Sequence, residues 1–194
     1  KRIGIGENFR FGRNREGDAS TLMEVGASLG IEVIVVPIIE DNAGRMSSSR
    51  IRSALAAGNL KEAKSLLGRS YSFHGIVIKG KGIGKGLGWP TANLEVNGRK
   101  FLPALGVYAA WAMEANGKKR YPTVMNLGPQ PTIDPNSPSA VEVHFLDQEI
   151  NLLGKELVIE PIQKLRDQIK FVDLQALSKQ IKIDADLSRS ILRT

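Results

Sequence analysis

The first part of the chain combines apolar runs with helix signals. Residues 31–39 form a nearly continuous apolar run, which is typical of a strand buried on both faces of a parallel sheet. Asp18 or Ser20 can cap a helix that ends at Gly30. Because residues 1–6 look like a strand leading into a turn, the order strand, helix, strand predicts a βαβ unit.

Two further helices are expected before residue 69. The segment Ser47–Arg52 opens the first, with Ser47 as its cap, and Asn59 caps a second, short helix that ends at Gly68. The second helix has the composition of a linker between domains. Free backbone N–H groups, hydroxyls and Arg52 at the start of the first helix could bind an anion or form a plain cap, and both interpretations remain open.

From residue 69 onwards the pattern is that of strands. Six stretches are expected to be strands: 71–79, 92–96, 106–114, 120–126, 140–147 and 155–163. Tight turns separate them, and Asn116-Gly117 is a strong hairpin signal. Six strands within about a hundred residues predict a closed antiparallel barrel. Asp173 is expected to cap a final helix that reaches about Leu192.

A glycine-rich run joins the first two of these strands. Lys79–Asn93 reads K-G-K-G-I-G-K-G-L-G-W-P-T-A-N, with glycine at every second position from 80 to 88. Its backbone is open in conformation, and its N–H groups could surround a bound anion with support from the lysines. A flexible loop or bulged hairpin with solvated lysines is the alternative.

The end of this run offers oxygen ligands. Pro90 fixes the chain, and Thr91 and Asn93 point the same way in an extended segment. A hydroxyl and an amide oxygen are hard ligands that suit Mg²⁺ on nucleotide phosphates. The run is not a Walker A loop, because Gly86 follows Lys85 and no helix is expected to begin there. Phosphate would therefore have to be held by a loop between strands.

A second candidate lies on the fifth expected strand. Alternation along Val141–Asp147 places Glu142 and His144 on one face, opposite the apolar residues. This face is either solvated or carries Glu142 as a general base for phosphoryl transfer. The sequence alone cannot bring Glu142 beside Asn93. The two histidines, His74 and His144, are expected to be structural because they are too few for a metal cluster.

Composition limits the function classes. The 194 residues suffice for one large domain or two small ones, and the net charge of +7 suits anionic ligands such as ATP or a nucleic acid. The 11 aromatic residues (Trp 2, Tyr 3, Phe 6) do not favour a nucleic-acid surface. There is no cysteine, no apolar run long enough to cross a membrane and no signal peptide, so we expect a cytoplasmic protein without disulfides. Since Lys1 is not a start methionine, we also expect a part of a longer protein.

Taken together, the motifs after residue 69 closely resemble riboflavin kinase. The resemblance rests on Gly80–Asn93 with its Gly-Trp-Pro-Thr-Ala-Asn ending, Gly106–Ala109, Asn126–Gly128 with Pro131-Thr132, Val141–His144, Leu165–Phe171 and Gln180–Asp184. It covers residues 69–194. Residues 1–68 are similar to the end of the adenylyltransferase domain of prokaryotic bifunctional riboflavin kinase/FAD synthetase, on Gly6–Asp18 and Ser48–Arg52. The implied fold is part of a Rossmann-like α/β nucleotidyltransferase domain (1–68) followed by a six-stranded barrel with a C-terminal helix (69–194).

The resemblance implies an activity and assigns roles to residues. The chain would phosphorylate the ribityl 5′-hydroxyl of riboflavin with ATP and Mg²⁺, giving FMN and ADP, without nucleic acid or membrane as a partner. Glu142 would accept the hydroxyl proton, and Thr91 and Asn93 would hold Mg²⁺. Arg166 and Phe171 would lie near the flavin. The ATP-binding residues would be Gly80, Lys81, Gly84, Lys85, Gly88, Pro90, Thr91 and Asn93.

Some positions depart from the family pattern. The adenylyltransferase motif H-x-G-H is missing, so this chain is expected to lack that activity, although Asn8, Phe9, Ser48, Ser49 and Arg52 correspond to its site. Asn8 stands where Asp is usual, Ser49 where Thr is usual, and Gln168 where Glu is common. A basic barrel that binds nucleic acid, or an inactive flavin-binding module, remain the alternatives.

Overall fold

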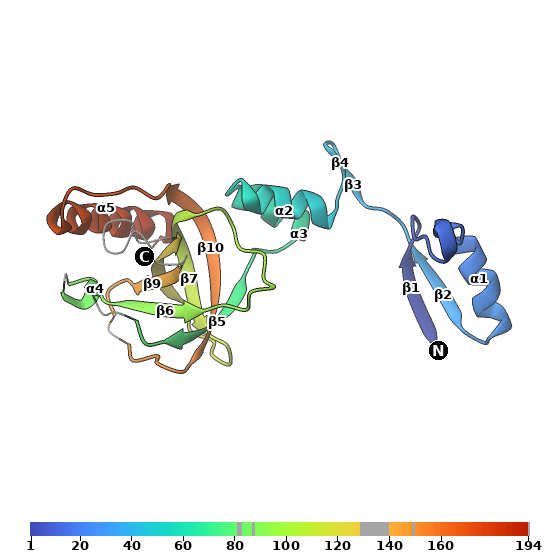
Figure 1. The fold of residues 1–194 in the computed structure, drawn as a ribbon, viewed down its shortest axis with the longest axis horizontal. Helices are drawn as coiled ribbons and strands as arrows, with labels where there is room; N and C mark the ends of the chain where they lie inside the picture. The colour runs from blue at the N-terminus through green and yellow to red at the C-terminus, as the bar shows by residue number, and fades with distance from the viewer. Residues whose placement is uncertain (81–82, 87, 129–139, 149, 194) are drawn as a thin grey trace. The chain divides into compact units, whose positions relative to one another are not determined.

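The computed structural model describes residues 1–80, 83–86, 88–128, 140–148 and 150–193. It divides into two compact units, Lys1–Ser48 and Ser49–Thr194, which are described separately below (Figure 1). The expected surface loop at 134–138 and the Pro131-Thr132 motif lie outside the described residues.

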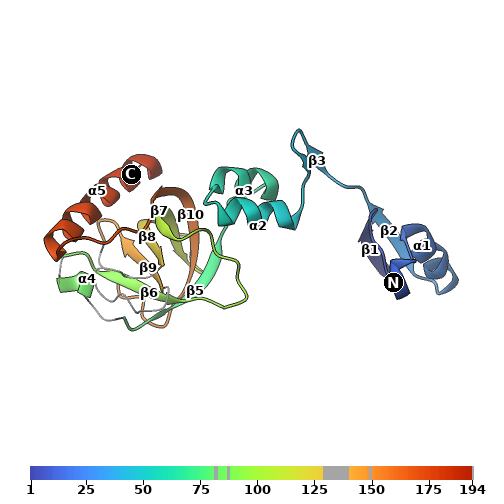
Figure 2. The same cartoon turned by 45° about the horizontal axis from the view of Figure 1, so that its top comes forward.

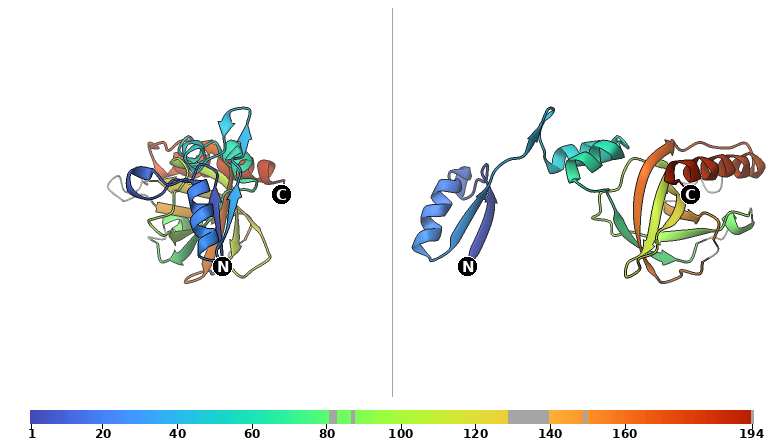
Figure 3. Two further views of the ribbon diagram at one scale, coloured as in Figure 1. Left: turned by 90° about the vertical axis from the view of Figure 1, so that its right-hand side faces the viewer. Right: turned by 180° about the vertical axis from the view of Figure 1, so that it is seen from behind.

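The first unit contains the predicted βαβ order. Strands β1 (Arg2–Gly6) and β2 (Glu32–Val36) pair in parallel, and helix α1 (Ala19–Ser28) lies against β2, as Figure 3 shows. Asp18, not Ser20, caps α1, because its side-chain oxygen accepts from the Thr21 backbone N–H at 2.9 Å. The smaller elements are the 3-10 helix η1 (Arg13–Arg15) and the two-residue strands β3 (Glu40–Asp41) and β4 (Gly44–Arg45).

The prediction that residues 31–39 are buried on both faces is wrong. The strand stops at Val36, and its residues alternate between half-buried and exposed. Ile34 is 45% exposed and Ile39 is 66% exposed. The sheet in this unit has two strands, and α1 packs on it from one side, so the other face of β2 has no layer against it in the described residues.

The second unit is built on a closed barrel, as the sequence predicted (Figures 1 and 2). Its strands are β5 (Phe73–Ile78), β6 (Thr91–Glu95), β7 (Gly106–Glu114), β8 (Tyr121–Gly128), β9 (Ala140–Phe145) and β10 (Glu156–Arg166). Neighbours pair antiparallel in the order β10-β5-β6-β9-β8-β7, with β7 closing on β10. The interior holds fully buried side chains such as Phe73, Tyr108, Met125 and Ile159.

Helices α2 (Ser48–Ala56) and α3 (Leu60–Leu67) share the core of the barrel. The Asn59 side chain caps α3 by accepting from the Glu62 backbone N–H, and Gly68 ends it in the left-handed conformation, as predicted. Leu55 is 2% exposed, and its carbonyl oxygen accepts from the Ala104 backbone N–H at 2.9 Å. The two helices therefore stabilise the barrel from one side, while the domain limit at residue 68 stays a prediction.

Helix α5 (Leu174–Leu192) crosses the outside of β7, β8 and β10. Asp173 caps it as predicted, since its carboxylate accepts from the Ala176 backbone N–H at 2.7 Å. Between α5 and the barrel lies a second, small apolar cluster of Val107, Val124, Leu146 and Ala185. None of the helices in the described part of the chain has the length and apolar character that a membrane span needs.

We predict that Leu55→Ala lowers the stability of the barrel. The change removes a buried side chain from the shared core, which costs about 2–5 kcal/mol in the free energy of unfolding. Urea denaturation followed by circular dichroism measures this loss. Leu29→Ala is the matched control, because Leu29 is 67% exposed in the first unit. Equal effects of the two substitutions would show that α2 does not belong to the barrel core.

Candidate active site

The glycine-rich run between β5 and β6 folds back on itself. Residues Ile83–Gly86 form the one-turn helix α4, and the Trp89 backbone N–H donates to the Gly84 carbonyl at 2.8 Å. A Cβ added to Gly84 would lie 2.3 Å from the Trp89 carbonyl oxygen. This turn ends at Gly86, and the next element in the described part of the chain is β6, so the expectation that no helix begins after Lys85 is confirmed there. Lys81 and the side chain of Lys85 lie outside the described residues.

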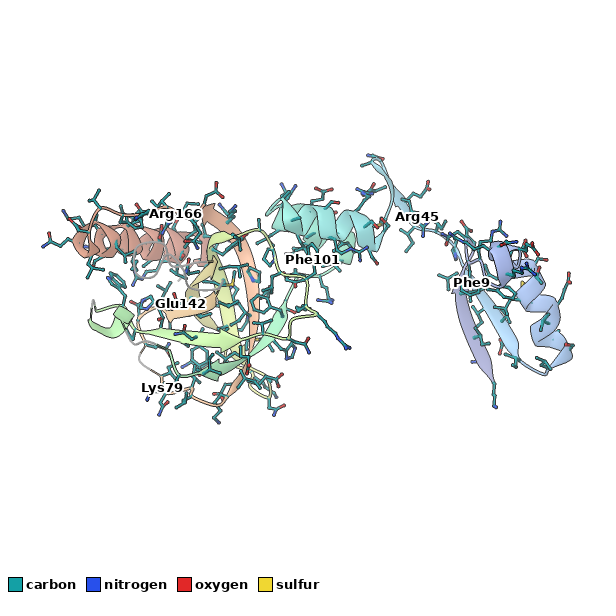
Figure 4. The ribbon with its side chains drawn as sticks, viewed as in Figure 1. Phe9, Arg45, Lys79, Phe101, Glu142 and Arg166 are labelled. Atoms are coloured by element: carbon teal, nitrogen blue, oxygen red, sulfur yellow. The ribbon has the colours of Figure 1, made fainter. Side chains whose placement is uncertain are left out.

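Gly80 is in close contact with Asn93, one of the two predicted metal ligands. A Cβ at this position would lie 2.0 Å from the amide nitrogen of Asn93. A larger residue would displace the Asn93 side chain, so the glycine leaves room for Asn93 in its observed position. Lys79, labelled in Figure 4, precedes Gly80 and directly follows β5.

The register of β6 and β9 brings the two sequence candidates together. Asn93 pairs with Glu142, and Thr91 pairs with His144. Side chains of directly paired residues lie on one face of a sheet with Cβ atoms about 5 Å apart. The predicted alternation on β9 is confirmed, since Val141, Val143 and Phe145 are buried. Glu142, labelled in Figure 4, therefore lies beside Asn93 on the outer face of the barrel wall.

Sequence reasoning missed the third member of this row. Asn126 on β8 pairs with Glu142 from the other side, and its Nδ2 lies 3.5 Å from Glu142 Oε2. Asn93, Glu142 and Asn126 thus stand side by side on three neighbouring strands. The available signal was Asn126 itself, a polar residue between the apolar Met125 and Leu127 on β8.

The Trp89–Thr91 segment is held in place from two sides. The His144 Nδ1 lies 2.8 Å from the Pro90 carbonyl oxygen, and because a carbonyl only accepts, Nδ1 carries the donated proton. The indole N–H of Trp89 donates to Ser178 Oγ on α5 at 3.0 Å, and the Trp89 ring meets the His144 ring edge-on. These contacts fix the backbone that presents the Thr91 hydroxyl.

Thr91 and Asn93 form a donor set that fits a hard cation. They present a hydroxyl and an amide oxygen two residues apart on one face. Among the residues that the structure describes, no group of three or more His, Asp or Glu side chains could hold a metal ion. A cation here would take its remaining ligands from phosphates and water, which is how Mg²⁺ is commonly bound.

A cleft of about 210 Å³ adjoins Thr91. The ends of β5 and β6 form one wall, and the segment after β9 forms the other. The described lining residues are Val77, Ile78, Pro90, Thr91, Ala92, Phe145, Gln148, Ile150, Asn151, Leu152 and Leu153. The mixture of apolar walls with a few polar groups is typical of a small-molecule site.

Arg166 is engaged within the protein. Its guanidinium donates to both oxygens of the buried Asp184 carboxylate at 2.8–3.1 Å and to the Asp167 carbonyl oxygen at 3.0 Å. Gln180 also donates a hydrogen bond to Asp184, and the Arg166 guanidinium lies 5.7 Å from the centre of the Phe171 ring. These contacts pin the chain between β10 and α5. The flavin contact expected of Arg166 and Phe171 stays a prediction.

The residues that correspond to an adenylyltransferase site have local contacts. The Phe9 ring stacks on Phe11 with 5.8 Å between centroids. With its amide oxygen turned toward Arg45, Asn8 accepts from both terminal guanidinium nitrogens at 2.7 and 3.0 Å. Ser48 and Ser49 begin α2, where the Arg52 guanidinium donates to Ser49 Oγ at 3.3 Å. Their role in binding ATP stays a prediction.

Burial makes His144 a source of pH-dependent stability. Burial, more than any other cause, places the pKa of His144 below its ordinary value of 6.5. The Arg189 charge lowers the pKa further, while the hydrogen bond to Pro90 and the charge of Asp147 raise it. The folded protein therefore binds a proton at His144 less readily than the unfolded chain does.

We predict that the free energy of unfolding falls as the pH drops below 6.5. In this window the unfolded chain binds more protons than the folded protein, so lower pH favours unfolding. Urea denaturation at about pH 7.5 and about pH 5.5 measures the change. The fall should be smaller in His144→Asn than in His74→Asn, the matched control at an exposed histidine. Equal falls in the two variants would contradict the assignment.

Known proteins are similar to this chain over nearly its whole length. The sequence model of the riboflavin kinase family matches residues 67–192, and that of the FAD synthetase family matches residues 1–50. A protein of Escherichia coli strain K12 described as bifunctional riboflavin kinase/FMN adenylyltransferase is 35% identical over 95% of this chain and 58% of its own length. A Pseudomonas fluorescens protein with the same description is 34% identical over 96% of this chain and 59% of its own length.

A solved structure is similar over the same extent. The crystal structure of a Streptococcus pneumoniae protein described as a macrolide-efflux protein has a TM-score of 0.79 and 32% identity, covering 95% of this chain and 58% of that one. This chain thus spans somewhat more than half the length of these relatives. Since the riboflavin kinase match alone covers well over half of the sequence, the chain belongs to the riboflavin kinase family, with a short FAD synthetase segment ahead of the kinase part.

Proposed function

We propose that this chain transfers the terminal phosphoryl group of ATP to the ribityl 5′-hydroxyl of riboflavin, giving FMN and ADP. Membership of the riboflavin kinase family supports the choice of flavin and ATP as substrates. The observation that carries the proposal is the pairing of Glu142 with Asn93 across β9 and β6. It puts a carboxylate beside a hard-oxygen donor set, which is the pair of features that phosphoryl transfer to an alcohol needs.

The cleft beside Thr91 would receive the nucleoside end of ATP. Its apolar side chains can pack against a base, and the Thr91 hydroxyl marks the edge from which the phosphates leave toward Asn93. Gly80 lies against Asn93, so the backbone of the glycine-rich run passes close to the path of the phosphates. The N–H groups of such a run can donate to phosphate oxygens.

Thr91 and Asn93 would hold Mg²⁺, which would offset the negative charge of the phosphates. Their own contribution is orientation. His144 holds the Pro90 carbonyl, Trp89 is tied to α5, and the β6–β9 pairing fixes Asn93 next to the carboxylate. The donor groups are therefore in place before a ligand arrives, which reduces the cost of binding.

Glu142 would accept the proton of the ribityl 5′-hydroxyl while the oxygen of that hydroxyl forms a bond to the terminal phosphorus of ATP. The bond from phosphorus to the bridging oxygen breaks, and ADP leaves with the electron pair. The flavin ring would then lie on the side of Glu142 toward the segment after β10, where Phe171 offers an aromatic face. Because the guanidinium of Arg166 is bound to Asp184, we assign Arg166 a role in holding this segment.

The adenylation of FMN is a separate proposal for the longer relatives. This chain lacks the H-x-G-H motif, so we propose that it makes FMN but not FAD. Asn8, Phe9, Ser48, Ser49 and Arg52 would take part in nucleotide binding only in a protein with the remainder of that domain.

We predict that Glu142→Gln lowers kcat for FMN formation by about 10²–10⁴, because the amide cannot take up the hydroxyl proton. The assay combines riboflavin, ATP and Mg²⁺ and separates FMN by chromatography. Glu95→Gln is the matched control, since Glu95 is an exposed carboxylate on the same strand as Asn93. Unchanged turnover in Glu142→Gln would remove this carboxylate from the reaction, and absence of FMN from the folded wild type would refute the proposed activity.

We predict that Asn93→Ala raises the Mg²⁺ concentration needed for half-maximal activity by about tenfold or more. The substitution removes one of the two protein oxygen ligands and leaves the strand pairing of β6 intact. Titration of FMN formation with Mg²⁺ at saturating ATP measures the effect. Asn116→Ala, in the turn after β7, serves as control. The same Mg²⁺ dependence in Asn93→Ala and wild type would exclude Asn93 as a ligand.

A further inference from the structure

The orientation of the Asn126 amide is determined by Gln168. Gln168 lies on the chain between β10 and α5, and its side-chain nitrogen faces two oxygen atoms. The nitrogen is 2.6 Å from Asn126 Oδ1 and 3.3 Å from the Leu127 carbonyl oxygen. A backbone carbonyl can only accept a hydrogen bond, so the Gln168 group that faces it must be the NH₂. This backbone atom removes the usual ambiguity in the direction of a side-chain amide.

The orientation of the Asn126 amide also determines which of its groups faces Glu142. Since Gln168 donates to Asn126, Asn126 presents its oxygen to Gln168 and its own NH₂ to Glu142, with Nδ2 3.5 Å from Oε2. An ionised carboxylate has acceptors only, so an NH₂ is the group that stabilises it. The reversed amide would place an oxygen against the carboxylate.

Two glycines on neighbouring strands allow the segment around Gln168 to pack closely against the barrel. Gly128 has a φ of +140°, and a Cβ added there would lie 3.2 Å from the Gln168 nitrogen. A Cβ added to Gly106 would lie 2.6 Å from the Arg166 carbonyl oxygen. The ion pair between Arg166 and the buried Asp184 anchors this crossing segment to α5. The segment that carries Gln168 is therefore held by contacts to two strands and one helix.

From this geometry we propose that Asn126 and Gln168 are positioning residues for Glu142. Asn126 holds the carboxylate from the side opposite to Asn93, and Gln168 fixes Asn126 in the orientation that donates to it. The inference rests on the proposed role of Glu142 as the base. It also gives a role to Gln168, whose side-chain NH₂ faces both the Asn126 oxygen and the Leu127 carbonyl. A carboxylate at this position cannot donate to the Leu127 carbonyl. The hydrogen bonds that run from Gln168 through Asn126 to Glu142 (the relay) therefore depend on the glutamine of this chain.

The test compares substitutions that preserve shape but change hydrogen-bonding polarity. Gln168→Glu turns the relay around, because the carboxylate accepts from Asn126 and directs the Asn126 oxygen at Glu142. Gln168→Met removes the donor, so residue 168 no longer favours either orientation of the Asn126 amide. Asn126→Asp removes the donor to Glu142 altogether. Each is assayed in the full chain for FMN formation, with kcat and the KM values for riboflavin and ATP determined separately.

We expect kcat to fall by about tenfold to a hundredfold in Asn126→Asp and Gln168→Glu, the kinetic equivalent of one hydrogen bond to a charged group. Gln168→Met should lose less than Gln168→Glu, and the KM for ATP should change little in all three. A purely structural role would give the opposite order, because Glu is closer to Gln in shape and polarity than Met is. Wild-type kcat in Gln168→Glu, or a greater loss in Gln168→Met, would overturn the proposal.

A spectroscopic measurement separates this inference from the proposed function. The side-chain NH₂ signals of Asn126 in ¹H–¹⁵N spectra, identified by their loss in Asn126→Asp, should move in both Glu142→Gln and Gln168→Glu. Unmoved signals would refute the relay whatever the activity. If Glu142→Gln retains full turnover while the signals move, the contact exists and the base assignment fails instead.

Discussion

The antiparallel pairing of β6 with β9 is the constraint on which the candidate site depends. It sets Asn93 opposite Glu142 and Thr91 opposite His144. A shift of one residue in this register would turn every side chain of β6 to the other face and bury the donor groups in the barrel. The apolar residues Leu94, Val141 and Val143 oppose such a shift, because they occupy the core in the observed register. The packing of the barrel and the arrangement of the site are therefore stabilised by the same strand pairing.

Helix α5 and the segment that leads into it support the candidate site on the outer face of the barrel. A small apolar cluster under α5 keeps the helix against β7 and β8, and the Arg166–Asp184 pair closes the end of the crossing segment. From this side come Ser178, which holds Trp89, and Gln168, which contacts Asn126. A buried ion pair adds little net stability compared with apolar packing, yet its loss leaves an unpaired charge, so it fixes geometry strongly. The site thus has support from a helix that contributes no proposed reacting group.

The two units relate differently to this chemistry. The second unit contains every residue of the proposed kinase site. Residues of α2 and α3 share its barrel core. The first unit is a two-stranded sheet with one helix against it and matches the FAD synthetase family over residues 1–50. Its strand residues include exposed apolar side chains, such as Val36 at 50% exposure.

The sequence by itself determined most of the longer helices and strands. Period-two alternation, the caps Asp18, Asn59 and Asp173 and the glycine stops located the helices and strands, because these signals act over a few residues. The motif Pro90–Asn93 and Glu142 were recognisable as ligand and base candidates. Only the tertiary structure decided that they meet, since strand register depends on packing between residues some fifty positions apart along the chain. It also revealed Asn126 and Gln168, turned part of the glycine-rich run into a helical turn, and left β2 half-exposed, because each of these depends on which neighbours fold against it.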